Sequence, residues 1–328
     1  MSKRTESGGR STEELVAAAR MYYEQDVNQG EIAERLGVSR STISRMLADA
    51  REMGVVRIRI VHPAERQLHL ENQLESRFGL QAARVVAGSS DQLVAREDIS
   101  LVASDYLDEL LEDGMTVAIS NGRSISRMVN TIAPRHPRAI VAAQMIGSIG
   151  RQNPMIDGPE VARQLARAYG GVFRAVHAPL LAETEAAREV FLSDPSVRET
   201  LDLAANAHIA LIGIGEMGAP GPIFAGLISH EDLADLRNRD AVGHTCAQFY
   251  DAAGRSVEHS VNRRAVAISF EALRRIPIVV AVAAGADKAV AIRGALTGGL
   301  ITALITDAAA ARAILGSPAR PARNQTER

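Results

Sequence analysis

Residues 29–48, QGEIAERLGVSRSTISRMLA, decide the fold of the first part of this chain. Ile32 and Leu36 lie one helical turn apart, so they predict the apolar face of a first helix. Gly37 follows, where a tight turn needs a residue that tolerates positive φ. A short helix, a glycine turn and a second helix in this order are typical of a helix-turn-helix. A plain helical hairpin within a larger helical domain is the alternative.

The second helix of this motif carries residue types that contact DNA. Val38 is expected to fill the corner and Ser39 to cap the helix, and an apolar face continues through Ile43, Met46 and Leu47. The exposed positions hold hydroxyl groups and arginines but no acid, and such side chains suit phosphates and base edges. We therefore predict that this helix enters the major groove with Ser39, Arg40, Ser41, Thr42, Ser44 and Arg45.

The flanking residues predict a winged helix. Residues 11–14 form a capping-box pattern at the start of a preceding helix, and Asn28 is expected to cap the next one. Residues 55–60 alternate and are β-branched, which predicts a strand. Arg57 and Arg59 lie on one side of that strand, so we expect them to contact DNA phosphates from the wing.

Composition limits the classes of protein that the chain can belong to. Its 328 residues allow two or three domains, and a hydrophobic content of 46% can build a sizeable core. A net charge of −2 means that DNA contact must come from local arginines. One cysteine excludes an internal disulfide and a cysteine-rich zinc site, and no apolar run is long enough to span a membrane. With no signal-peptide pattern, we expect a cytoplasmic protein without cofactor or metal.

Beyond the winged helix, the sequence predicts a linker and a second domain. Residues 64–78 are apolar at helical spacing, so we expect a linker helix that packs on the next domain or pairs with a second subunit. We divide the chain into a flexible N-terminus, a winged helix, a linker helix, an α/β domain and a disordered tail, at residues 1–10, 11–61, 62–80, 81–316 and 317–328.

Short apolar strands alternate with helices in the α/β domain. The strand candidates are residues 84–87, 115–119, 140–143, 172–176, 208–212, 278–282 and 302–305. This spacing, with helices between the strands, predicts βαβ units and a mostly parallel sheet. Because ligands bind such sheets at the carboxyl ends of the strands, we searched the turns that follow the strands for a site.

Two of these turns have the composition of an anion site. One turn follows a strand, opens a helix and contains Ser120, Asn121, Gly122, Arg123 and Ser124. Backbone N–H groups and the helix dipole favour an anion there. The other turn, residues 284–288, ends in Lys288. Because both turns belong to one edge of the sheet, we expect Arg123 and Lys288 to hold one anion between free N–H groups. The alternative is a pair of tight turns with solvated cations.

Further candidates follow other strands. Residues 213–218, GIGEMG, match the letters of a dinucleotide fingerprint, but Pro220 and Pro222 follow at once where the fingerprint needs a helix. We therefore assign Gly213 and Gly215 to the close approach of a small ligand. A nucleophile–base set and a metal-ligand spacing are both missing from the sequence, so we assign no catalytic residue and no metal. The other candidates for contacts with ligand hydroxyls are Gln144, His244, Gln248 and Asp251.

Four segments have the pattern of a known family. They are the helix-turn-helix, NGRS at residues 121–124, GHTCAQFYDAAG at residues 243–254, and NRRAVAISFEALRRIPIVVAVAAGADKAVAIRGALTGGLITALITD at residues 262–307. With them the chain, from residue 12 to residue 316, resembles the SorC family of bacterial sugar-responsive transcription regulators. The resemblance implies a C-terminal domain like that of sugar-phosphate isomerases, used for sensing and not for turnover. It also implies tetramers and effectors that are often phosphorylated sugars.

The chain departs from this family pattern at two places. The family usually has glycine and tryptophan where this chain has Ser120 and Asn121, and Asp and Arg where it has His244 and Gln248. The prediction is an operator-binding regulator, dimeric or tetrameric, that is controlled by a sugar, a polyol or a sugar phosphate. One alternative is an isomerase- or aldolase-like enzyme fused to a DNA-binding module. Another is a recombinase-like protein, whose serine domain or acidic metal triad the sequence lacks.

Overall fold

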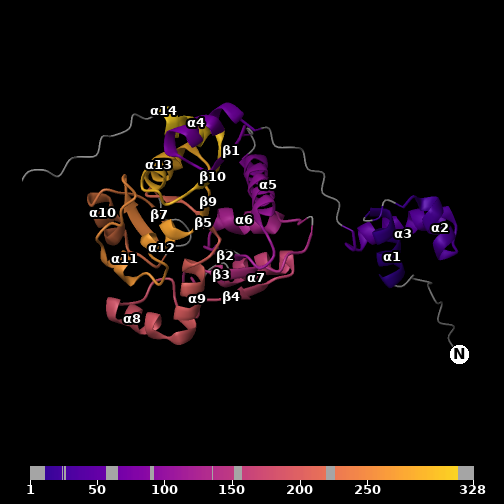
Figure 1. Ribbon diagram of the computed structural model, residues 1–328, viewed down its shortest axis with the longest axis horizontal. Helices are drawn as coiled ribbons and strands as arrows, with labels where there is room; N and C mark the ends of the chain where they lie inside the picture. Colours follow the sequence, from indigo (N-terminus) through magenta and orange to yellow (C-terminus); the bar gives the residue numbers. More distant parts are fainter. Residues whose placement is uncertain are drawn as a thin grey trace, which may run out of the picture. The chain divides into compact units, whose positions relative to one another are not determined.

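A computed structural model describes residues 12–23, 25, 27–56, 66–88, 92–134, 136–150, 157–218 and 226–316. The chain divides into two compact units, Met1–Pro63 and Ala64–Arg328, and Figure 1 draws both. Each unit has a hydrophobic core of its own. Among the helices of the described residues, none combines the length and the apolar character that a membrane crossing needs.

The smaller unit contains three helices, α1 (Thr12–Tyr23), α2 (Gln29–Leu36) and α3 (Arg40–Glu52). Helix α3 packs against both α1 and α2. Their shared core consists of small and aliphatic side chains: Leu15, Ala18, Ala19, Ile32, Ala33, Ile43, Met46, Leu47 and Ala50. The short helices α2 and α3, joined by a three-residue turn, confirm the predicted helix-turn-helix.

Local hydrogen bonds set the ends of these helices. Gly37 ends α2 in the left-handed conformation with φ of 65°, as its position in the motif predicts. The side chain of Asn28 accepts hydrogen bonds from two N–H groups at the start of α2, and Ser39 Oγ accepts one from the N–H of Thr42 in α3. The capping box predicted at residues 11–14 begins outside the described residues.

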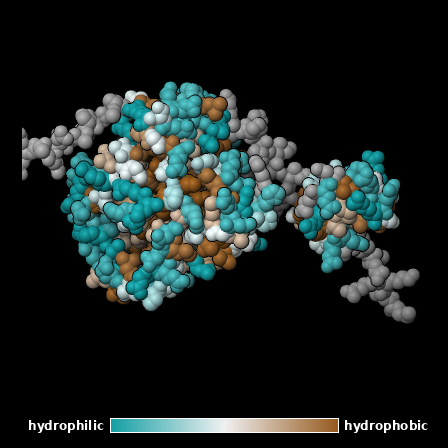
Figure 2. All heavy atoms as spheres, viewed as in Figure 1, coloured by the Kyte–Doolittle hydropathy of each residue, from teal (hydrophilic) through white to brown (hydrophobic). Residues whose placement is uncertain are grey.

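Two predictions about the motif's apolar positions are wrong. Leu36 is 36% exposed and Val38 is 38% exposed, so neither fills the core. Ile32 and Ala33 already occupy the space against α3, and the left-handed turn at Gly37 leaves the last residue of α2 and the corner residue outside. Figure 2 shows apolar side chains among hydrophilic ones on the visible face of this unit. The wing strand, Arg57 and Arg59 lie largely or wholly outside the described residues.

The larger unit is built on a seven-stranded sheet in the order β1-β10-β9-β5-β2-β3-β4 (Figure 1). All neighbouring strands are parallel, which confirms the predicted parallel α/β architecture. The apolar runs found in the sequence lie on these strands, because the inner strands of a parallel sheet are buried on both faces, whereas β4 at the edge is exposed. The bounds are β1 (Ala82–Val86), β2 (Thr116–Ile119), β3 (Val141–Gln144), β4 (Val172–Arg174), β5 (Ile209–Gly213), β9 (Ile278–Val282) and β10 (Ala303–Asp307).

Helices cover both faces of this sheet. Strand β1 separates the two cores, because Ala82 and Val86 belong to one and Ala83 and Val85 to the other. The first core is covered by α5 (Gln92–Leu110), α6 (Arg123–Thr131) and α7 (Gly158–Tyr169). The second is covered by α4 (Leu68–Phe78), α9 (Pro195–Ala205), α12 (Phe270–Arg275), α13 (Ala289–Thr297) and α14 (Ala308–Gly316). The remaining helices are α8 (Glu185–Ser193), α10 (His230–Asn238), α11 (Ser260–Arg264) and the 3₁₀ helix η2 (Ala286–Lys288).

The predicted linker helix belongs to the larger unit. It begins at Leu68 and not at residue 64, and Leu70 and Leu74 are buried where α4 packs on β1 and α14. The carboxylate oxygens Glu71 Oε1 and Glu75 Oε1 accept hydrogen bonds from outward N–H groups of β1, which protects this edge of the sheet. The buried side of α4 is therefore used within the chain, as the first alternative expects, while Leu68 at its start is 61% exposed.

The larger unit also contains a second, three-stranded sheet, which the sequence did not predict. It is antiparallel and contains β6 (Gly215–Glu216), β7 (Ala241–Thr245) and β8 (Gln248–Asp251). Cys246 and Ala247 form the turn between β7 and β8 with φ of 47° and 60°. Two-residue hairpin turns with positive φ are usually made by Asn and Gly. Because Cys and Ala stand at these positions, the sequence pattern did not indicate a hairpin.

The order of strands identifies where a ligand can bind. From β2 the chain moves outward to β3 and β4, and it then returns to β5 on the other side of β2 and continues to β9 and β10. This reversal makes the gap between the carboxyl ends of β2 and β5 a topological switch point, which is the usual place of a ligand in such sheets. The turn that starts at Ser120 and the turn that follows Gly213 lie there.

Candidate functional site

Helix α3 presents a polar face that suits DNA. Arg40, Ser41, Ser44 and Arg45 are exposed, as predicted from the sequence. Its first turn contains no acidic residue, so the positive end of the helix dipole is not neutralised. The two remaining candidates have a structural task as well, because the hydroxyls of Ser39 and Thr42 lie 2.8 Å apart at the cap of the helix.

The turn after β2 leads into a helix without a cap. Gly122 has φ of 118°, and no side chain of the described structure caps the first N–H groups of α6. Helices α4 and α13 also have no side-chain cap, whereas side chains of Asp157, Thr184, Asp194, Ser229, His259 and Ser269 cap α7 to α12 in turn. The N-terminus of α6 therefore offers unshared N–H groups and a positive dipole end at the switch point, which together favour an anion.

The side chain of Asn121, like the N-terminus of α6, has a hydrogen-bond donor that a ligand could use. This residue is 5% exposed, and its side-chain nitrogen Nδ2 has no hydrogen-bond partner within the described residues. A buried amide N–H that is not hydrogen-bonded costs about 1–3 kcal/mol. A ligand oxygen at the switch point would remove this cost.

The second predicted turn differs from its prediction in one respect. Gly285 has φ of 106°, and its N–H is not free but donates to Asp307 Oδ2 at 2.9 Å. The sequence could not reveal this bond, because Asp307 ends β10, the strand beside β9. The turn continues as η2, which ends at Lys288. This turn therefore contributes its cation rather than free N–H groups.

The charges of the two turns influence each other. Burial lowers the pKa of Lys288, the positive charges of Arg123 and Arg96 lower it further, and Asp287 and Glu216 act in the opposite direction. Strand β6, which contains Glu216, contacts η2 directly. Lys288 is thus a partly buried ammonium group near two guanidinium groups and two carboxylates, and a bound anion would favour its charged form.

Three charged residues near this site were not among the candidates predicted from the sequence. Arg96 at the start of α5 and Arg127 in α6 belong to the same group of cations, since burial and the charges of Arg96 and Arg123 lower the pKa of Arg127. Glu216 supplies negative charge near Lys288. A signal for Arg127 was present: Arg123 and Arg127 lie four residues apart at the N-terminal end of a helix, where like charges and the dipole are both unfavourable.

His244 lies within this group as a neutral side chain. It pairs with Gly215 across β6 and β7, and a Cβ atom at Gly215 would lie 2.0 Å from His244 Nε2. The imidazole alone therefore requires glycine at position 215, and the close approach of a ligand there stays a prediction. Burial, together with the charge of Lys288, lowers the pKa of His244 to about 4. The neutral ring faces Phe249 with 5.2 Å between ring centroids.

Four other candidates have their side chains committed to the fold. Gln144 Oε1 accepts from the N–H of Val176, Ser120 Oγ donates to the carbonyl of Asn121, and Gln248 Nε2 donates to the carbonyl of Ile268. Asp251 lies at the end of the hairpin away from the β7–β8 turn. Its carboxylate accepts from the N–H groups of Ala253 and Arg255 and from Arg255 Nε. Each of these four side chains therefore has a structural role in the fold, and contact with a ligand stays a prediction for them.

The remaining candidates are Gly213, Ser124 and the segment 213–218 that matches the letters of a dinucleotide fingerprint. Gly213 ends β5, and its carbonyl accepts a hydrogen bond from Thr245 Oγ1 at 2.8 Å. Residues 215 and 216 form strand β6, so the chain stays extended where a dinucleotide fingerprint requires a helix. Ser124 is half-buried in the first turn of α6, beside Arg123.

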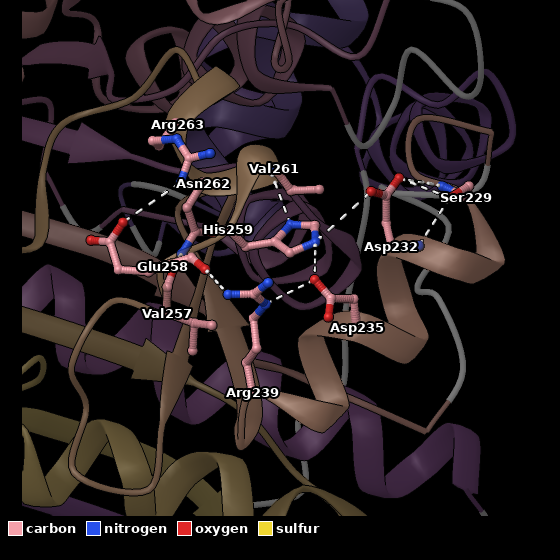
Figure 3. A network of polar contacts seen from close by, with 10 residues as sticks. All are labelled: Ser229, Asp232, Asp235, Arg239, Val257, Glu258, His259, Val261, Asn262 and Arg263. Carbon is pink, nitrogen blue, oxygen red and sulfur yellow. Dashed lines mark hydrogen bonds and ion pairs between the residues drawn. The ribbon is translucent and has the colours of Figure 1, made fainter.

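A second polar network, drawn in Figure 3, serves the fold. His259 Nδ1 accepts from the N–H of Val261, and His259 Nε2 lies 3.2 Å from Asp235 Oδ2. Arg239 donates to Asp235 and to the carbonyl of Glu258, so the network joins α10 to the segment before α11 (Figure 3). Within the described ranges, no group of three or more His, Cys, Asp or Glu residues is arranged to hold a metal ion.

Comparisons with known proteins agree with this arrangement. Residues 62–316 match a family model described as "Putative sugar-binding domain", and residues 20–53 match the model of sigma-70 region 4. The deoxyribonucleoside regulator of Bacillus subtilis is 30% identical over 302 residues, which cover 92% of this chain and 96% of the relative. The sorbitol operon regulator of Klebsiella pneumoniae is 32% identical over 314 residues, which cover 92% of this chain and 97% of the relative.

Solved structures show the same similarity. The full-length sorbitol operon regulator SorC from Klebsiella pneumoniae has a TM-score of 0.71 and 28% identity, and the match covers 93% of this chain and 100% of that one. A probable sor operon regulator from Shigella flexneri has a TM-score of 0.71 and 26% identity, and the match covers 76% of this chain and 98% of that one.

A helix-turn-helix unit together with a sugar-binding domain defines a sugar-responsive, DNA-binding transcription regulator. The relatives are transcription regulators and not enzymes, which decides against the isomerase-like alternative. The chain belongs to the SorC family.

The buried His244 predicts a pH dependence of stability. The unfolded chain binds a proton near the ordinary pKa of 6.5, whereas the folded site binds it only near pH 4. The free energy of unfolding should therefore fall as the pH drops through this window, by about 2 kcal/mol between pH 7 and pH 5 from this residue alone. His244→Gln removes the titrating group, so urea unfolding should show a shallower loss between these pH values than in the wild type. Equal losses in both proteins would contradict a neutral, buried His244.

Proposed function

We propose that this regulator binds operator DNA through α3 and that a sugar derivative with an anionic group binds at the switch point between β2 and β5. The observation that carries the proposal is the buried, unpartnered amide of Asn121 beside the uncapped N-terminus of α6. A regulator of this kind acts on DNA in the cytoplasm. The wing, with Arg57 and Arg59, remains part of the proposal as a phosphate-binding element.

The charges favour a phosphorylated effector. Arg123 lies close enough to Lys288 for its charge to lower the pKa of Lys288, and α6, which begins at Arg123, has no side-chain cap on its first N–H groups. A phosphate accepts charge-assisted hydrogen bonds from all of them. The amide of Asn121, the neutral imidazole of His244 and the carboxylate of Glu216 are then the candidates for contacts with hydroxyl groups.

The names of the relatives support the chemical class of the effector. Those names refer to a sorbitol operon and to deoxyribonucleosides, which are built on a polyol and on a sugar. We propose a sugar, a polyol or a sugar phosphate for this chain, with the phosphorylated form preferred. Binding to one conformation more tightly than to the other shifts operator affinity by that difference, typically about 1–3 kcal/mol.

The DNA-binding face generates one prediction. A bidentate contact between arginine and guanine contributes about 1–3 kcal/mol of discrimination, whereas a phosphate contact carries no sequence information. Arg45→Ala should therefore weaken operator binding far more than binding to unrelated DNA, and Arg198→Ala, an exposed position of α9, should change neither. Gel shifts at one fixed salt concentration measure both affinities. Equal losses on operator and unrelated DNA would assign Arg45 to the phosphates.

The anion site generates another. Arg123→Ala and Lys288→Ala should leave operator binding without ligand nearly unchanged, because neither residue belongs to the DNA-binding unit. Both should blunt the response to a sugar phosphate, because each removes a charge-assisted hydrogen bond. The measurement is an operator-binding titration with and without effectors found in a thermal-shift screen of sugars, polyols and their phosphates. Arg198→Ala is the matched control. A full response in both site variants would contradict the shared anion site.

We propose in addition that the protein works as a dimer or a tetramer. One helix-turn-helix forms a small interface with DNA, and two copies that read two half-sites gain affinity and specificity. The buried face of α4 is excluded as the pairing surface, since β1 and α14 cover it. Light scattering at micromolar concentration should return at least twice the chain mass of 35.0 kDa. A monomer both with and without operator DNA would contradict this.

A further inference from the structure

The carboxylate of Asp307 joins two elements of the larger unit. Its Oδ2 accepts from the N–H of Gly285 at 2.9 Å, and its Oδ1 accepts from the N–H of Ala310 at 2.7 Å. The first bond holds the turn after β9, and the second caps the start of α14. Because both oxygens belong to one rigid group, a displacement of that turn is passed to the first turn of α14.

The turn held by Asp307 is the one that carries Lys288. Gly285 has a backbone conformation that L side chains rarely adopt, and a Cβ atom there would lie 2.3 Å from Asp287 Oδ1. The carbonyl of Gly285 then accepts from the N–H of Lys288 at 3.1 Å and closes η2. The direction of the lysine side chain therefore depends on the conformation that Asp307 fixes at Gly285.

Helix α14 leads from this turn to the start of the larger unit. It contacts η2 at one end and packs on α4 along its length. At the other end Arg77 Nη1, in the last turn of α4, donates to the carbonyl of Leu315 at 2.6 Å. Helix α4 is the first helix after the boundary between the two units, which falls at Pro63 and Ala64.

We propose that Asp307 is a positioning residue for the effector response: it holds the Lys288 turn in its binding conformation and couples occupancy of the anion site to α14 and α4. This inference rests on the proposed function, because it assumes an anion at Lys288. A simple helix cap would explain the bond to Ala310. It would not explain the bond from the same carboxylate to Gly285.

Two substitutions of Asp307 separate its role as the cap of α14 from its role as the link to Gly285. Asp307→Asn keeps the size of the side chain but removes its charge and one acceptor oxygen. Asp307→Ser keeps a group that caps helices but is too short to serve both N–H groups. The control is Asp113→Asn. Asp113 Oδ1 also accepts a backbone hydrogen bond, from the N–H of Ala139 at 2.7 Å. Asp113 lies before the amino end of β2, whereas Asp307 lies at the carboxyl end of β10.

Hydrogen exchange on the full-length protein tests the inference, first without ligand. The amide of Gly285 should exchange about tenfold faster in both Asp307 variants than in the wild type, while the amides of α6 are unchanged. The amide of Ala310 should lose protection in Asp307→Asn and keep most of it in Asp307→Ser. Asp113→Asn should change neither amide.

Inorganic phosphate is then added as the probe. In the wild type, phosphate should slow exchange at residues 121–124 and also in α14 and α4. In Asp307→Asn and Asp307→Ser, phosphate should still protect residues 121–124, but only at a higher phosphate concentration because Lys288 is no longer held in place, and at saturation the response of α14 and α4 should be lost. The same response of α14 and α4 in wild type and variants would overturn the role of Asp307 and leave the anion site standing. No protection at residues 121–124 in the wild type would overturn the anion site, and this inference with it.

Discussion

An uncapped helix N-terminus at the switch point of a parallel sheet is the constraint on which the site depends. Helix α6 begins at Gly122 without a side-chain cap, and so does α13, which follows the turn of Lys288. Positive charge gathers there at Arg123 and Lys288, where mutual repulsion is unfavourable. A buried amide at Asn121 lacks its acceptor. An anion with oxygens to share would relieve all of these costs at once.

The sheet topology and the small antiparallel sheet of the larger unit position the residues around the N-terminus of α6. The reversal of strand order opens the gap between β2 and β5, and both faces of the sheet are closed by helices. The small sheet brings His244 against Gly215 and keeps the imidazole neutral through burial and the charge of Lys288. The site therefore combines cations for an anionic group with neutral polar groups for hydroxyls, as a sugar derivative requires.

The sequence could predict what depends on local pattern. The helix-turn-helix and the parallel strands follow from periodicity, and the rule that parallel strands end on one edge selected the turns of Arg123 and Lys288 as candidates. The sequence could not predict hydrogen bonds between residues that are distant in the chain. Asp307 accepts a hydrogen bond from the N–H of Gly285, and Gln248 Nε2 donates one to the carbonyl of Ile268. The hairpin at Cys246 was missed because its residues are atypical of the turn.

The most direct test of the account is the backbone amide NMR spectrum of residues 121–124 during titration with inorganic phosphate and, separately, with neutral sugars. The account predicts saturable shifts of these amides with phosphate, the largest at the start of α6, and much smaller shifts there with neutral sugars of the same panel. Shifts confined to other parts of the sheet edge, with residues 121–124 unperturbed by phosphate, would contradict it.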